Sequence, residues 1–144
     1  MSDNTSLESI FRLVHSFKRQ MREQIESLDS EIAPMNIRVM KLITKKSPCT
    51  AIDIANCLCR DKAQVTRLVN TTINQELVKK SPNPEDKRSQ LLVLTSKGED
   101  IMTKVSNIDR EMLQRMTKGI TKDELEQFNQ IANKMAQNLE NHPK

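Results

Sequence analysis

The most informative segment of the chain is 82–98, which reads PNPEDKRSQLLVLTSKG. It begins with Pro-Asn-Pro, which favours a turn, and it continues into the apolar run 91–94, which predicts a strand. The residues 77–80, Leu-Val-Lys-Lys, supply a partner strand on the other side of the turn. The segment therefore predicts a β-hairpin with Lys87 and Arg88 in its loop. Such a hairpin is either an ordinary solvated turn or an arm that reaches along a nucleic-acid groove, and the preceding residues bear on that choice.

Two capped helices precede the hairpin. Thr50 begins a short helix with Asp53 three positions later, and this helix ends near 59–60. Asp61 occupies the cap position of the next helix, which runs to about residue 76. Two helices joined by a turn of about three residues and followed by a basic hairpin form a winged helix-turn-helix arrangement.

The second of these helices separates an apolar face from a polar face. Its apolar face, which must pack inward, holds Val65, Leu68, Val69, Thr72 and Ile73. The opposite face holds Ala63, Arg67, Asn70 and Asn74, flanked by Gln64 and Thr71. No acidic residue lies between 62 and 75, whereas a solvated surface helix normally mixes Glu and Lys. Arg pairs with guanine edges, Asn and Gln pair with adenine, and a small methyl contacts thymine. The polar face therefore predicts DNA contact.

Positive charge is concentrated in the same region. The net charge of the 144 residues is +4. The segment 60–97 holds eight Lys or Arg and four Asp or Glu, and the charges of the flanking segments nearly cancel. A localised basic patch is typical of a protein that binds a polyanion.

The remaining segments predict helices with apolar stripes. Apolar residues recur every three or four positions over 7–28, and a second helix is expected over 34–45. After Gly98 a helical stripe continues to Gly119, and a last helix follows over 121–139. The expected fold is mainly α with a small β-hairpin wing. The long, narrow stripes favour packing against other helices.

Composition narrows the class of function. The chain has 2% aromatic residues, eight Met and only two Gly, so its core must be aliphatic and no phosphate-binding Gly-rich loop is present. Two His and no convergent acid–base pair give an enzyme little support, and neither a cofactor nor a metal site is predicted. The N-terminus lacks the pattern of a signal peptide, and the apolar runs are too short to span a membrane. We expect a cytoplasmic protein.

The three cysteines, Cys49, Cys57 and Cys59, do not suggest a disulfide framework or a zinc site. The favoured interpretation is small buried thiols on a helix. The alternative is redox sensing.

The residues 65–69, 77–78, 84–88 and 94–98 together resemble the multiple-antibiotic-resistance regulator (MarR) family. The motif covers about forty residues, and the helix order around it is consistent over the whole chain. The resemblance implies an obligate homodimer with a winged helix-turn-helix in each lobe, in which the first and last helices interlock. Here it implies one domain over 1–144, with the lobe at 30–98 and dimerisation helices at 5–29 and 99–141.

The resemblance also assigns residue roles. Arg88 is expected in the minor groove with Asp86 steadying the wing, and Thr66 and Arg67 are expected to make major-groove and phosphate contacts. The predicted DNA-binding set is Lys62, Ala63, Gln64, Thr66, Arg67, Asn70, Lys87 and Arg88, with Asp86 as support. One departure is Glu76, where the family often has Gly. That position commonly takes a positive backbone angle, so we expect a slightly shifted helix end without loss of the fold.

The function implied is a homodimeric repressor that binds a palindromic operator in double-stranded DNA and is released by a small phenolic or anionic effector. The effector residues expected are Phe11, His15, Arg38 and Met40, from the helices that flank the crevice between the dimer region and the lobe. One alternative is a redox-responsive regulator that uses the three cysteines. Another is a winged-helix dimer that binds protein instead of DNA.

Overall fold

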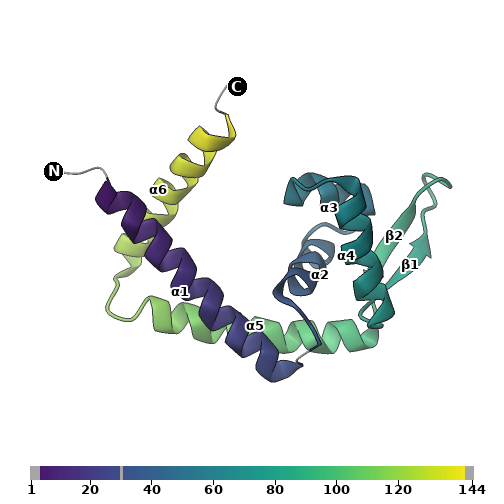
Figure 1. Cartoon of the computed structure of the whole chain (residues 1–144), viewed down its shortest axis with the longest axis horizontal. Coiled ribbons are helices and arrows are strands. Elements are labelled where there is room, and N and C mark those ends of the chain that lie inside the picture. The colour runs from purple at the N-terminus through teal and green to yellow at the C-terminus, as the bar shows by residue number, and fades with distance from the viewer. Residues whose placement is uncertain (1–3, 30, 142–144) are drawn as a thin grey trace. The chain divides into compact units, whose positions relative to one another are not determined.

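The computed structural model describes residues 4–29 and 31–141 (Figure 1). Within them the elements run α1 (Asn4–Leu28), α2 (Pro34–Lys45), α3 (Ala51–Leu58), α4 (Lys62–Asn74), β1 (Val78–Pro82), β2 (Gln90–Leu94), α5 (Ser96–Met116) and α6 (Lys122–Glu140). The predicted class, mainly α with a β-hairpin, is confirmed. The main differences are at helix ends: α4 ends at Asn74 and α5 begins at Ser96, before Gly98.

The chain divides into two compact units, Met1–Ile108 and Asp109–Lys144. In the first unit, α2, α3, α4 and the hairpin pack around one core. The core is aliphatic and sulfur-containing, as the composition predicts, and its most buried side chains are Val39, Met40, Ile54, Val65, Leu77, Val78 and Val105. Because these side chains come from α2, α3, α4, the first strand of the hairpin and α5, the same core positions both α4 and the hairpin.

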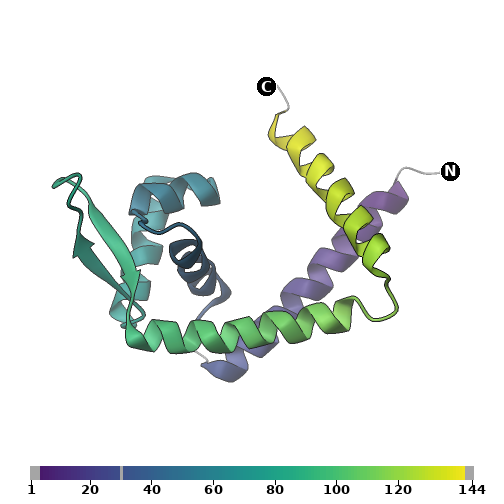
Figure 2. The ribbon, with the colours of Figure 1, turned by 180° about the vertical axis from the view of Figure 1, so that it is seen from behind.

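The hairpin is a two-stranded antiparallel sheet in which Val78 lies opposite Leu94 and Pro82 lies opposite Gln90. Val78 and Leu92 are buried and attach the sheet to the lobe. The amide of Leu92 also donates to the carbonyl of Cys49 at 2.8 Å, which joins the sheet to the residue before the α3 cap. In both ribbon views the turn of the hairpin lies at the end away from α5 (Figures 1 and 2). The turn is therefore free to reach beyond the helices.

The turn between α4 and β1 contains a left-handed residue. Glu76 has φ 62°, a region that favours glycine, so this residue takes the positive angle that the resemblance associates with the position. The expected shift of the helix end stays a prediction. The chain then passes close to the start of α5. A Cβ added to Gly98 would overlap the carbonyl oxygen of Leu77 and lie 3.1 Å from its carbonyl carbon. Glycine at 98 therefore permits the close approach of α5 to the end of α4.

Two helices expose apolar stripes. In α1 the buried residues are Met21 and Ile25, whereas its N-terminal half exposes Leu7, Ile10, Phe11, Leu13, Val14 and Phe17. In the second unit, α6 has no buried residue, and it exposes Phe128, Ile131, Met135 and Leu139. Large apolar surfaces of this kind usually mark a protein interface. Across residues 4–29 and 31–141, helices with the length and apolar character needed to cross a lipid bilayer are absent.

Candidate nucleic-acid interface

The helix α4 begins at a tight turn after α3. Cys59 ends α3 in the left-handed region with φ 53°, which turns the chain within a few residues. Asp61 then caps α4, because its Oδ1 accepts a hydrogen bond from the amide of Gln64 at 2.8 Å. Thr50 caps α3, the other helix of the pair, because its Oγ1 accepts a hydrogen bond from the amide of Asp53 at 3.3 Å. The predicted caps and the helix-turn-helix arrangement are confirmed.

The two faces of α4 are separated as predicted. Val65, Val69 and Thr72 are buried, and Leu68 and Ile73 are half-buried. The outer face is exposed at every predicted position, namely Ala63, Gln64, Arg67, Asn70, Thr71 and Asn74. The helix therefore presents a row of amide, hydroxyl and guanidinium groups to an external partner.

A buried polar contact that the sequence does not predict fixes α4 to α2. Asn36 Nδ2 donates to Thr72 Oγ1 at 3.2 Å, and that hydroxyl donates to the carbonyl of Leu68 at 2.8 Å. The same Asn36 accepts from the amide of Ala33 through Oδ1 at 3.0 Å, which closes the start of α2. Asn36 is 3% exposed and Thr72 is fully buried, so this contact sets the position of α4 against α2.

The wing loop is held by its own polar side chains. The amide of Arg88 donates to Asp86 Oδ1 at 2.9 Å, and the amide of Ser89 donates to the carbonyl of Asp86 at 3.2 Å. Asn83 Nδ2 donates to Ser89 Oγ at 3.0 Å across the loop. Asp86 thus fixes the backbone at Arg88, while the residue Arg88 itself is exposed. A fixed backbone with an exposed guanidinium suits insertion into a groove.

A groove of about 290 Å³ separates α4 from the wing. Lys62, Thr66 and Asn70 line it from α4, and Lys80 and Arg88 line it from the hairpin. Three cations thus converge on one hollow, and its lining includes no carboxylate. The structure therefore brings four of the predicted DNA-binding residues together. Lys80 was missed, because a lysine on a predicted strand carries no signal of which side of the hairpin it occupies.

A second, shallower hollow of about 340 Å³ lies along another side of α4. Gln64 and Arg67 line it together with Arg60, a residue of the turn that was also not predicted. Ala63 and Lys87 are exposed, and they line neither of these two hollows. The predicted residues thus lie along α4 and in the wing, with basic hollows on two sides of the helix.

The predicted effector residues do not share one environment. Phe11 is 71% exposed on α1, and His15 and Arg38 are exposed. Met40 is fully buried in the core of the lobe, so a ligand would contact it only if the core repacked. Both hollows along α4 are lined by other residues.

The cysteines divide into two kinds. Cys49 is buried, and burial raises the pKa of its thiol to about 11, so the thiol is protonated and unreactive at neutral pH. Cys57 and Cys59 are exposed, and all three thiols are free. The prediction of buried thiols is right for Cys49 and wrong for the other two. Cys57 lies on the solvent side of a helix of only eight residues, and Cys59 lies in the turn after it.

Comparison with known proteins agrees with this architecture. The sequence profile of the MarR family matches residues 33–90, from the start of α2 to the start of β2. The multiple antibiotic resistance protein MarR of Escherichia coli (strain K12) is 28% identical over 119 residues, which cover 79% of this chain and 81% of that protein. The HTH-type transcriptional repressor IacR of Pseudomonas putida is 22% identical over 124 residues, which cover 86% of this chain and 73% of that protein.

A solved structure shows the same fold. The crystal structure of an S. aureus MepR–DNA complex superposes with a TM-score of 0.82 and 22% identity, and the match covers 96% of this chain and 99% of that chain. The chain is thus similar to MarR-family proteins in sequence, with the family profile matching residues 33–90, and it shares their fold.

Proposed function

We propose that this protein is a sequence-specific DNA-binding transcriptional regulator that acts as a homodimeric repressor. The observation that carries the proposal is the groove between α4 and the wing, where Lys62, Lys80 and Arg88 converge and the lining holds no carboxylate. An electropositive hollow beside a polar helix face matches the negative charge and the base edges of duplex DNA. MepR was crystallised with DNA, IacR is named a repressor, and MarR-family proteins are transcription regulators rather than enzymes.

The proposed role of each residue in DNA binding follows from its place on the outer face of α4 or in the wing. The outer face of α4 enters the major groove, where Arg67 and Asn70 read base edges and Thr66 contacts the backbone. Arg88 enters the minor groove from the wing, and Asp86 holds the backbone from which Arg88 extends. The other DNA contacts proposed are Lys62, Ala63, Gln64 and Lys87. We add Arg60 and Lys80 as phosphate contacts, because they line the two hollows beside α4.

The second copy of the chain covers the exposed apolar stripes. The stripes on α1 and α6 have no partner within their own units, and an apolar helix face is stabilised by packing against another. Two lobes related by a two-fold axis would meet two half-sites one helical turn apart, so the operator is an imperfect palindrome. Such a regulator works beside the DNA that it controls, and we propose that it acts in the cytoplasm.

Release by a small phenolic or anionic effector completes the proposal. Phe11, His15 and Arg38 are accessible side chains for such a ligand, and Met40 would join them only after repacking. The lobe and the dimerisation helices remain assigned to 30–98, 5–29 and 99–141.

The test is protection of the DNA upstream of the protein's own gene, followed by variants. Arg67→Ala should weaken operator binding about 5- to 100-fold and bind random DNA with nearly unchanged affinity, because a base contact is lost. Arg88→Lys keeps the charge but loses the planar guanidinium, so operator affinity should fall while the salt dependence stays the same. Lys104→Ala, which removes a charge from an exposed position on α5, is the control.

The rival proposal is a winged-helix dimer that binds an acidic protein. Both a DNA complex and a complex with an acidic protein weaken as the salt concentration rises. Duplex DNA, however, releases condensed counterions, so the logarithm of the DNA-binding constant falls linearly with the logarithm of the salt concentration, with a slope of about 0.9 for each phosphate contact. Binding to no duplex at low salt, with the dimer intact, would refute DNA regulation and favour the protein partner.

A further inference from the structure

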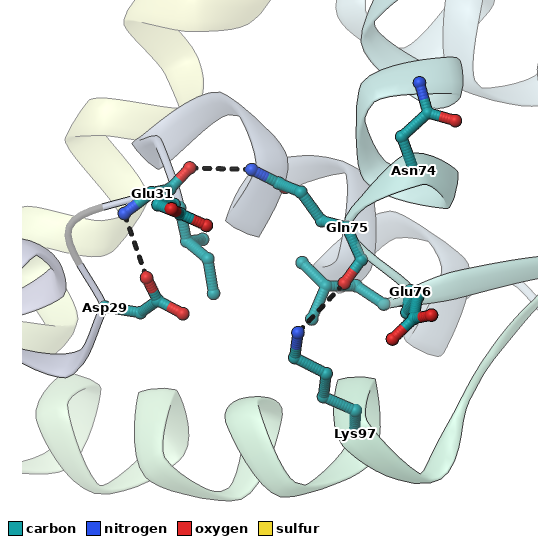
Figure 3. Close-up of a pocket in the computed structure, with 8 residues that line it drawn as sticks. Asp29, Glu31, Asn74, Gln75, Glu76 and Lys97 are labelled. Atoms are coloured by element: carbon teal, nitrogen blue, oxygen red, sulfur yellow. Dashed lines mark hydrogen bonds between the residues drawn. The ribbon is translucent and has the colours of Figure 1, made fainter.

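Three segments that are distant in sequence meet at the C-terminal end of α4 (Figure 3). On one side, Gln75 Nε2 donates to the carbonyl of Glu31 at 2.7 Å, in the linker between α1 and α2. That linker is itself fixed, because the amide of Glu31 donates to Asp29 Oδ1 at 2.9 Å. On the other side, Lys97 extends from α5 and its Nζ donates to the carbonyl of Gln75 at 3.1 Å. Gln75 thus connects the C-terminal end of α4 to both flanking segments.

The start of α5 makes further contacts with the same turn. Thr95 Oγ1 donates to the carbonyl of Glu76 at 2.6 Å, and the amide of Thr95 donates to the carbonyl of Leu77 at 3.0 Å. The amide of Gly98 donates to Thr95 Oγ1 at 3.0 Å. Thr95, the residue before α5, and Lys97 in the first turn of α5 thus supply donors to the carbonyls of three successive residues after α4, Gln75, Glu76 and Leu77.

The turn after α4 includes two features that destabilise the folded protein, one at Gln75 and one at Glu76. Gln75 Oε1 is buried and has no hydrogen-bond partner among the described residues, and the residue lines a polar pocket of about 200 Å³. A buried acceptor without a donor is destabilising. The next residue, Glu76, is in the left-handed region, which also costs free energy for a residue with a Cβ. Two unfavourable features at adjacent residues favour a role in geometry over a role in stability alone.

The position of Gln75 gives it influence over the DNA-facing residues. Thr72 is fixed against α2 by its contact with Asn36 and lies three residues before Gln75 and five after Arg67. At a rise of about 1.5 Å per residue, these separations are about 4.5 Å and 7.5 Å along the axis of α4. If the helix pivots at Thr72, a sideways displacement of about 0.5 Å at Gln75 moves Arg67 by about 0.8 Å. A shift of that size is large compared with the range of good hydrogen-bond distances.

We propose that Gln75 and Lys97 are positioning residues that set the orientation of α4 and thereby the specificity of DNA recognition. The proposal rests on the proposed DNA-binding function. It assigns neither residue a contact with DNA. The contacts from the α1–α2 linker and from α5 hold the end of the helix, and the fixed end aligns the outer face with the bases.

The test uses Gln75→Met and Lys97→Met, with Lys104→Met as the matched control on α5. The dimeric protein is titrated with operator DNA and with random duplex over a range of salt. Each test variant should lose about 5- to 30-fold in operator affinity. Affinity for random DNA and the slope of log K against log salt should match those of the control.

Two further readouts separate positioning from a merely structural role. The urea midpoint of Gln75→Met should stay close to that of the control, because the substitution removes an unpaired oxygen together with a hydrogen bond. In the DNA-free protein, amide hydrogen exchange in the last turn of α4 should be faster in both test variants than in the control.

The outcomes distinguish the possibilities. Equal losses on operator and random DNA with a smaller salt slope would make Lys97 a phosphate contact and overturn the proposal. Unchanged operator affinity, unchanged exchange in α4, or an affinity loss that tracks the loss of stability would also overturn it. Failure of the wild-type protein to bind any duplex would remove the proposed function itself, and the positioning role with it.

Discussion

Replacing Glu76 with glycine should stabilise the protein. Glu76 has φ 62°, and the left-handed region costs a residue with a Cβ about 1–2 kcal/mol, a strain that glycine does not carry. Glycine also gives the unfolded chain more conformational freedom, which offsets about 0.4–1 kcal/mol of the stability gained by relieving this strain. The expected net gain is about 0.5–1 kcal/mol, or about 2–4 °C in Tm for a chain of this size. The hydrogen bond from Thr95 to the carbonyl of residue 76 is retained, because it uses the backbone.

The assay is urea unfolding at one fixed protein concentration, because the stability of the proposed dimer would depend on concentration. Glu76→Ala is the essential control, since it removes the same carboxylate but keeps a Cβ in the left-handed region. Cys59→Gly, at a second non-glycine residue with positive φ, should show a similar gain by the same reasoning. If Glu76→Gly is no more stable than Glu76→Ala, the backbone angle carries no strain and the reasoning is refuted.

Three other changes test separate features of the fold. Gly98→Ala should lower the free energy of unfolding by about 1–3 kcal/mol, because the added Cβ would overlap the carbonyl of Leu77, and urea titration measures the loss. The hydrogen bond from Lys46, and to a lesser extent the hydrogen bond from a backbone amide, lowers the pKa of the Asp53 carboxyl. The ionised carboxylate therefore stabilises the folded protein above the ordinary pKa of 3.8, and this stabilisation is lost as the pH falls through the lower pKa of the folded state. Asp53→Asn should therefore have a flatter stability profile below about pH 4, and an unchanged profile would show that the pair contributes nothing. An alkylating reagent at pH 8 should modify two thiols in the folded protein and the third, Cys49, only in denaturant, whereas rapid modification of all three would contradict its burial.

Much of the lobe was predictable because its signals are local. The caps at Thr50 and Asp61 lie within three or four residues of the groups that they satisfy, and the period of the apolar residues separates the faces of α4. The positive angle at Glu76 was predictable from the family resemblance. The loop of the wing was likewise predictable, since Asp86 bonds to a backbone amide only two residues away.

Contacts between distant residues were not predictable. Gln75 and Glu31 are 44 residues apart, and Asn36 and Thr72 are 36 apart, so no periodic pattern links them. Nothing in the sequence indicates that Asn36 is buried, because Asn is usually exposed. The exposure of Cys57 was missed for the opposite reason, since free Cys is usually buried. In each case the tertiary packing overrides the ordinary tendency of the residue type.

The absence of any buried residue in α6 has a genetic consequence. In the proposed dimer a second subunit covers the apolar stripe of α6, and this contact is the same whether the partner has a normal or a defective wing. A copy altered only at Arg88 would therefore assemble with normal copies and leave each mixed pair with a single competent lobe. Alleles of this kind should be dominant over the wild type, whereas alleles that disrupt the stripe on α6 should be recessive.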